Sequence, residues 1–223
     1  MLGTNLVTEN LTEVPNGIDR KRDYNLNTFG VFIQNVWSVH ENITIETGLR
    51  GDDVNELGFE LLPRISTMFK ITPKLTTRIG GGFGYKPPTI FTEDAERRQF
   101  SSILPIDMIN ARNERSKGLN WDINYKTKFG DISFSFNQLF FYTHLAQPLV
   151  LSNTSGTIFA FKNANGSLDT KGMETNVRLT YADFKLFIGY TYTNANTNFD
   201  NVKQWLPLTA RHRLNNVLMY EIE

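Results

Sequence analysis

Apolar and polar side chains alternate with a period of two residues along most of this chain. The pattern is clearest at residues 184–193, where Phe184, Leu186 and Ile188 fall on one face and Lys185 falls on the other. Successive side chains of a β-strand point to opposite faces, so the alternation predicts strands with one apolar and one polar face. Nine or ten such strands are expected, at residues 2–11, 29–39, 43–50, 64–71, 75–85, 119–129, 132–143, 173–181, 184–193 and 213–223.

The connections between these strands alternate between short and long. Short connections are expected at residues 40–42, 72–74, 130–131 and 182–183, and long ones at residues 54–62, 86–117, 152–171 and 194–212. Transmembrane β-barrels have this asymmetry, with short periplasmic turns and long extracellular loops. The expected strands also exceed the roughly five or six residues usual in globular proteins and match the roughly 9 to 11 that cross a bilayer. The pattern therefore favours an all-β, antiparallel transmembrane meander.

Aromatic residues are abundant, with 17 Phe, 8 Tyr and 3 Trp. Two interpretations stay open, because aromatic side chains favour strands in general and also form girdles at both membrane interfaces of transmembrane barrels. The residues near strand ends that a girdle would use are Tyr85, Trp121, Phe129, Phe141, Tyr142, Tyr181, Tyr190 and Tyr192. All eight prolines are expected outside the middle of the strands, which agrees with this assignment.

Charge and cysteine content exclude several classes of function. The chain has 23 basic and 23 acidic side chains, so its formal net charge is zero and nucleic acid is not an expected partner. It has no cysteine, which excludes disulfides and thiolate metal sites. No apolar run approaches the roughly 18 residues of a membrane-spanning helix.

Three glycines, Gly80, Gly82 and Gly84, alternate along one expected strand and share a face with Arg78. Two interpretations remain open for these bare positions. They either kink the strand to curve a barrel or provide a surface that another domain approaches closely. A phosphate-binding loop is disfavoured, because the G-x-G-x-x-G spacing is missing and no helix is expected to follow.

The sequence does not predict an enzyme. The three histidines, His40, His144 and His212, lie far apart and form no H-x-x-H or H-E-x-x-H arrangement. No G-x-S-x-G motif marks a nucleophilic serine. We therefore expect no catalytic residue, no metal site and no cofactor.

Two of the expected connections carry charged clusters. Asp52, Asp53, Glu56 and Glu60 could bind Ca²⁺ through carboxylates, but their spacing is not that of an EF-hand, so a solvated cluster is favoured. The connection at residues 86–117 is far longer than usual, and is expected to be either a folded functional element or disordered. Its charged residues are interpreted as solvated, with ligand or lipopolysaccharide contact as the alternative.

Seven short segments, taken in order, resemble the barrel strands of TonB-dependent outer-membrane receptors. They are TFGVFIQ (28–34), ETGLRGD (46–52), LPRIS (62–66), RIGGGFGYKPPT (78–89), NERSKG (113–118), GME (172–174) and LPLTARHRLN (206–215). Each motif is weak alone, but seven in the right order over roughly residues 24–223 are specific. Ala210 departs from the pattern, since the family usually has proline there.

The resemblance implies a bacterial outer-membrane protein with a 22-stranded barrel and an N-terminal plug. Such receptors import siderophores, cobalamin, sugars or other large nutrients with energy delivered through TonB. It further implies that residues 1–223 form part of the barrel and that the plug, with its TonB contact, lies outside them. Outer-membrane lipid and lipopolysaccharide are the other implied partners.

Within this interpretation, ligand contacts are expected at lumen-facing or rim residues, because inward polar side chains tune selectivity in barrels. The residues predicted for this role are Arg78, Tyr85, Phe91, Arg97, Arg98 and Arg115. Two alternatives remain open. One is a small self-contained porin or structural barrel. The other is a soluble carbohydrate-binding β-domain, whose apolar faces would pack together and leave no lipid-facing belt.

Overall fold

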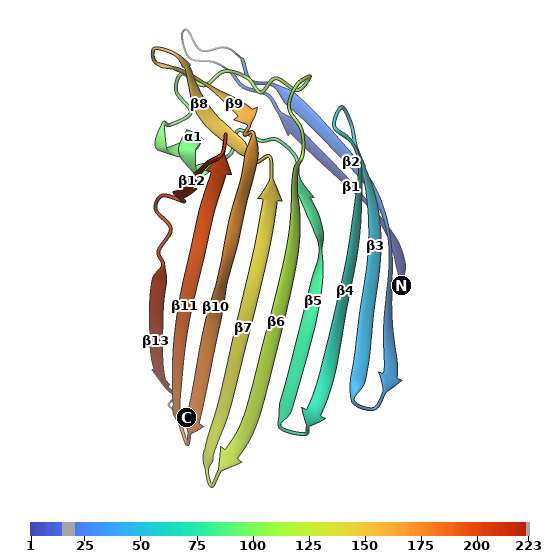
Figure 1. The fold of residues 1–223 in the computed structure, drawn as a ribbon, viewed down its shortest axis with the longest axis vertical. Helices are drawn as coiled ribbons and strands as arrows, with labels where there is room; N and C mark the ends of the chain where they lie inside the picture. Colours follow the sequence, from blue (N-terminus) through green and yellow to red (C-terminus); the bar gives the residue numbers. More distant parts are fainter. Residues whose placement is uncertain (15–20, 222–223) are drawn as a thin grey trace.

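A single antiparallel sheet makes up most of the molecule in the computed structural model, which describes residues 1–14 and 21–221 (Figure 1). Its eleven strands follow the chain, and β7 is followed in the sheet by β10. The strands are β1 (Leu2–Leu11), β2 (Tyr24–His40), β3 (Ile43–Val54), β4 (Gly58–Thr72), β5 (Leu75–Lys86), β6 (Glu114–Phe129), β7 (Ile132–Ala146), β10 (Gly166–Tyr181), β11 (Phe184–Phe199), β12 (Val202–Trp205) and β13 (His212–Tyr220). Ten are long and β12 is short, so the predicted number of spanning strands is confirmed.

The four short connections lie at one end of the sheet, at the bottom of Figure 1. Each has two residues and joins β2 to β3, β4 to β5, β6 to β7 or β10 to β11, as predicted. Gly130 and Ala182 begin two of these turns with positive φ angles of 58° and 45°, as hairpin turns of the primed types do. We call this the short-turn end and the opposite one the loop end.

One connection predicted to be long, at residues 54–62, is short instead. Strand β3 ends at Val54 and β4 begins at Gly58, and Glu56 turns the chain with a φ of 66°. Pro63 lies inside β4, so the expectation that prolines avoid the strands was also wrong. Strand β5 pairs with β4 only from Arg64 onward. Pro63, which has no backbone N–H to donate, therefore lies just beyond the end of the hydrogen-bond ladder between β4 and β5.

The other long connections are more structured than predicted. Residues 152–171 contain most of a hairpin, β8 (Leu149–Ser155) and β9 (Ile158–Asn163), followed by the start of β10. Strand β11 extends to Phe199, and β6 begins at Glu114. These extensions are built largely from polar residues, so the apolar alternation that marks a half-buried strand fades before the strand ends.

The two faces of the sheet differ in polarity along its whole width. The cross-strand register defines an apolar row on one face: Trp37, Ile45, Thr67, Ile79, Trp121, Phe140, Met173 and Tyr192. The adjacent positions define a row on the other face: Val36, Glu46, Ser66, Gly80, Asn120, Phe141, Gly172 and Thr193. We call these faces the apolar face and the polar face.

The apolar face is exposed to its surroundings. Trp37 is 58% and Ile65 57% exposed, although both are large hydrophobic side chains. Trp121 stacks on Phe140 at 5.4 Å between ring centroids, and its Nε1 donates to Thr77 Oγ1 at 2.8 Å. Of the aromatic residues predicted for a girdle, Phe141 lies on the polar face, because the register pairs it with Asn120 and Gly172. No helix in the described part of the chain has the length and hydrophobicity of a membrane span.

The main apolar core lies at the loop end rather than against the sheet. It consists of Ile90, Ala95, Ile103 and Phe161, from the β5–β6 connection and strand β9. The β5–β6 connection also contains the short helix α1 (Glu93–Arg97), whose N-cap Thr92 accepts a hydrogen bond from the Ala95 N–H. Residues 87–113 and the β8–β9 hairpin are together called the loop cap.

Candidate functional site

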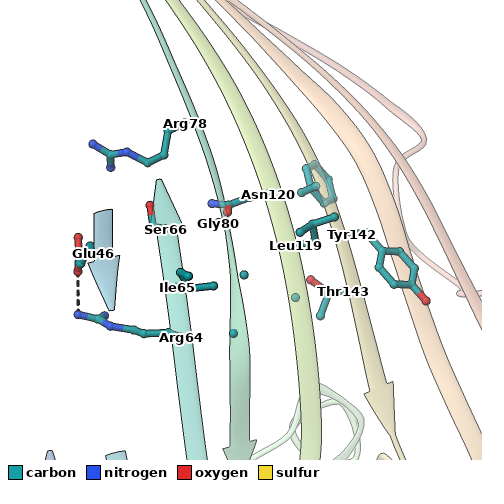
Figure 2. A pocket seen from close by; sticks show the side chains of 14 residues that line it. Glu46, Arg64, Ile65, Ser66, Arg78, Gly80, Leu119, Asn120, Tyr142 and Thr143 are labelled. Carbon is teal, nitrogen blue, oxygen red and sulfur yellow. Dashed lines mark hydrogen bonds and ion pairs between the residues drawn. The ribbon is translucent and has the colours of Figure 1, made fainter. Parts of the chain in front are cut away.

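A depression of 480 Å³ lies on the polar face in the middle of the sheet (Figure 2). Its floor is formed by Gly80, Gly82 and Gly118, which we call the glycine floor. Strand alternation places Gly80 and Gly82 on one face, and the register pairs Gly82 with Gly118 on β6. Residues of the polar face that also line it are Glu46, Arg64, Ser66, Arg78, Asn120, Phe141 and Thr143. Ile65, Gly81, Leu119 and Tyr142 border it as well, but strand alternation places them on the apolar face.

The glycine floor exposes backbone that side chains would otherwise cover. A Cβ atom on Gly82 would lie 3.0 Å from Arg64 Cβ and 3.1 Å from the Pro63 carbonyl oxygen. A Cβ atom on Gly80 would lie 3.1 Å from Ser66 Cβ. All three distances are tighter than ordinary van der Waals contact. Gly80, Gly82 and Arg78 therefore share one face as predicted, and the floor is open to a group that approaches from the polar side.

Arg64 borders the depression and bends away from the glycine floor toward β2 and β3. Its Nη2 donates to Gln34 Oε1 at 2.7 Å and to Glu46 Oε1 at 3.0 Å, and Gln34 Nε2 donates to the same Glu46 oxygen at 2.9 Å. Gly48 makes this path available, because a Cβ atom there would lie 2.7 Å from Arg64 Nε. The absence of a side chain at Gly48 on β3 thus allows the Arg64 side chain on β4 to extend toward Glu46.

Replacing Gly48 by alanine is expected to uncouple Arg64 from Glu46. The new methyl group displaces a flexible side chain, so the stability cost should be small while the ion pair is lost. In a double-mutant cycle on the free energy of unfolding, the coupling between Glu46 and Arg64 should be roughly 0.2–1 kcal/mol with Gly48 present and near zero with alanine. An unchanged coupling in the Gly48→Ala background would contradict this assignment.

Arg78 lies at the opposite border of the depression. Its Nη2 contacts Met68 Sδ at 3.7 Å, while its cross-strand neighbour Asp122 accepts a hydrogen bond from Asn124. Within residues 1–14 and 21–221, no carboxylate forms an ion pair with Arg78. This guanidinium can therefore bind a negatively charged or carbonyl oxygen that enters the depression.

Two carboxylates of the predicted acidic cluster are buried rather than solvated. Asp52, fully buried, accepts hydrogen bonds from Arg50 Nε at 2.7 Å and from the Tyr85 hydroxyl at 2.8 Å. Glu60, which is 5% exposed, accepts from Arg115 Nε at 2.9 Å. The two carboxylates face each other across β3 and β4, whereas Asp53 and Glu56 are exposed. The prediction of a solvated cluster was wrong for the first pair, because arginine partners compensate for the burial.

The structure does not bring the six predicted ligand residues together. Arg78 borders the depression, and Tyr85 and Arg115 bind the buried carboxylates at the loop end. The other three belong to the loop cap. Phe91 contacts the Phe100 ring edge-on at 5.9 Å, Arg97 pairs with Glu93 at 2.6 Å, and the Arg98 guanidinium lies 3.4 Å from the centroid of the Phe159 ring.

Sequence reasoning missed Arg64, Glu46 and Gln34 as a group. All three lie within or next to expected strands, and each falls on the polar face by simple alternation. What was missing was the register between strands, which places Gln34, Gly48 and Arg64 side by side. The period of two predicts the face of a residue but not its neighbour on the next strand.

The loop cap is a folded element, one of the two outcomes expected for the β5–β6 connection. Its two segments are joined by backbone hydrogen bonds from Leu104 N to Phe159 O at 2.8 Å and from Phe159 N to Ser102 O at 2.9 Å. Arg22, 6% exposed, reaches the cap and donates to the Phe100 carbonyl oxygen. Hydrogen bonds from Arg22 hold the pKa of Glu13 below its ordinary value.

Residues 3–221 match the model of the family described as TonB dependent receptor-like, beta-barrel. No curated protein matches the chain. Among solved structures, the siderophore receptor PirA from Acinetobacter baumannii is similar over 100% of this chain and 37% of its own, with a TM-score of 0.75 and 15% identity.

Two further solved structures share the fold. The siderophore receptor PirA from Pseudomonas aeruginosa has a TM-score of 0.71 and 16% identity, over 90% of this chain and 42% of its own. The FrpB iron transporter from Neisseria meningitidis has a TM-score of 0.65 and 16% identity, over 92% of this chain and 32% of its own. The chain thus spans less than half the length of these three proteins.

Proposed function

Because the chain belongs to the TonB-dependent receptor-like β-barrel family, we propose that it is part of a bacterial outer-membrane receptor that takes up a large nutrient. In this proposal the apolar face contacts lipid and the polar face lines the lumen. The long connections lie on the extracellular side and the short turns on the periplasmic side. A plug and its TonB contact would come from outside residues 1–223.

The continuous apolar row across the sheet is the observation that supports this proposal most. A soluble sandwich would cover such a row with a second sheet, whereas here Trp37, Ile79 and Trp121 are each at least 45% exposed. This argues against the soluble carbohydrate-binding alternative. The self-contained porin is disfavoured by the family match, since porins need neither a plug nor TonB.

Metal–siderophore complexes are the substrate class that we propose first. Solved structures with this fold are described as siderophore receptors and as an iron transporter. Arg78 and the backbone of the glycine floor offer the donors and the close approach that an oxygen-rich ligand, or the plug that presents it, requires. Outer-membrane lipid and lipopolysaccharide are proposed as partners of the apolar face and its loop-end rim.

Growth under iron limitation tests the proposal directly. The full-length receptor is expressed in a strain that lacks its own siderophore receptors and is supplied with ferric catecholate, hydroxamate or carboxylate siderophores. We expect growth on at least one class, and loss of growth when TonB is deleted. Growth that is unchanged without TonB would contradict energised uptake.

Filling the glycine floor tests the role of the depression. Gly80→Leu places a side chain in the depression and is expected to reduce uptake at least tenfold. The matched control is Gly189→Leu, also on the polar face but outside the depression, where the nearest atom to an added Cβ is Asn176 Oδ1 at 3.1 Å. Heat-modifiable migration on gels checks that both barrels fold. Equal uptake by the two variants would exclude a role for the floor.

A further inference from the structure

A second cavity, of 720 Å³, lies at the short-turn end of the polar face. Four cationic side chains line it, Lys74, Lys126, Lys128 and Arg178, and we call them the basic shelf. All four are exposed, Lys74 in a short turn and the other three on strands β6 and β10. The cavity is distinct from the depression, which has none of these residues in its lining.

The strand register places hydroxyl groups between these cations. Lys126 pairs with Ser135 on β7, which pairs in turn with Arg178 on β10. In the next row toward the turns, Lys128 pairs with Ser133, which pairs with Thr180. Cations and hydroxyls therefore form two parallel rows across three strands, and both groups donate hydrogen bonds to anionic oxygens.

Two acidic residues, Asp131 and Asp183, lie in the short turns next to the basic shelf, and neither forms an ion pair with a described residue. Other acidic side chains of this region have partners outside the shelf. Glu221 pairs with Lys185, and farther up the sheet Asp122 and Glu174 accept hydrogen bonds from Asn124 and Asn176. In the part of the chain that the structure describes, no carboxylate forms an ion pair with a residue of the basic shelf.

Four positive charges that share one cavity repel one another unless an anion joins them. The Arg178 guanidinium lies 5.1 Å from the centroid of the Phe187 ring. A low-dielectric wall of this kind strengthens attraction to a ligand of opposite charge. Among the described residues, the four positive charges of the basic shelf are thus not compensated by ion pairs.

We propose that the basic shelf binds a small polyanion with at least two carboxylate or phosphate groups. The volume of the cavity falls within the roughly 300–1,000 Å³ of small-molecule sites. The ammonium, guanidinium and hydroxyl groups that line it are hydrogen-bond donors, which carboxylate and phosphate oxygens accept. The location rests on the proposed function, since the short-turn end would then be where cargo leaves the lumen. An acidic protein segment offers the same chemistry, but the alternation of short hydroxyls with cations favours compact oxyanions.

Calorimetric titration of the purified full-length receptor in detergent tests the site, with citrate and tripolyphosphate as probes. The triple variant Lys126→Gln, Lys128→Gln and Arg178→Gln removes three charges from the basic shelf. The control variant Lys117→Gln, Lys162→Gln and Lys171→Gln removes three charges outside the cavity. Relative to the wild-type receptor, we expect the shelf variant to bind at least one of the two probes at least tenfold more weakly. The control variant should change the affinity for that probe less than twofold. Binding should also weaken as salt is raised.

Equal weakening in both triple variants would overturn the proposal, because it would show a general effect of net charge. Absence of binding to the wild-type receptor would overturn it as well. If the shelf variant then also melts at a lower temperature, an acidic segment of the receptor occupies the cavity instead. Titration does not depend on transport, so a receptor that binds polyanions without importing any siderophore would disprove the proposed function and leave this site standing.

Discussion

Replacing Ile65 by arginine is expected to lower the folding stability of the receptor in a bilayer by about 2–4 kcal/mol. Ile65 lies in the middle of β4 on the apolar face and is 57% exposed, so the new charge would meet the hydrocarbon layer. The matched control is Ser66→Arg, one residue along on the polar face. Folding into vesicles, followed by tryptophan fluorescence and gel migration, should fail or slow for the first variant only.

The opposite result would have a clear meaning. If Ser66→Arg impaired folding into vesicles and Ile65→Arg did not, the assignment of the faces would be reversed. Similar folding by both variants would show that neither face meets lipid. Two neighbouring residues can distinguish the faces because side chains along a strand alternate with a period of two, so Ile65 and Ser66 point to opposite faces.

Truncation of the loop-cap core is expected to unfold the cap without unfolding the barrel. Ile103 is 2% exposed and belongs to the cluster with Ile90 and Phe161, so Ile103→Ala should cost about 2–5 kcal/mol of cap stability. Limited proteolysis and hydrogen exchange should then show faster cleavage and exchange at residues 87–113.

The same substitution at Ile109 is the control for this prediction. Ile109 lies in the same connection but is 94% exposed, so Ile109→Ala removes no buried contact and should leave proteolysis unchanged. Equal protection in the two variants would show that the cluster does not hold the cap together. A melting temperature lowered for the whole barrel would show instead that cap and sheet unfold as one unit.

The strands and their faces could be predicted from the sequence because one alternation rule covers every residue of a strand. That rule found ten long strands and the four tight turns, including Gly130 and Ala182. It failed where polar residues continue a strand beyond the apolar belt, as at residues 194–199 of β11. There the strand continues through backbone pairing with β10, and its mostly polar sequence shows no apolar alternation although Ala195 is buried.

The candidate site could be predicted only in part. Gly80, Gly82 and Arg78 were placed on one face by alternation, and the structure shows them lining one depression. The partnership of Arg64 with Glu46 depends on strand register and on the missing side chain of Gly48. Burial of Asp52 and Glu60 likewise depends on arginines supplied at longer range, which a local pattern of charges does not reveal.

The pairing of Ser102 and Leu104 with Phe159 links two connections that are separated along the chain by strands β6 and β7. An insertion or deletion at either side of this junction would shift both connections together, so their lengths have to change in concert. The turn at Gly156 is different, since a Cβ atom added there would meet no atom within 4 Å, and the Gly156 carbonyl oxygen accepts a hydrogen bond only from Asn153 of the same hairpin among the described residues. A peptide epitope or fluorescent label inserted at Gly156 would therefore mark the outer surface of the cap while leaving the junction intact.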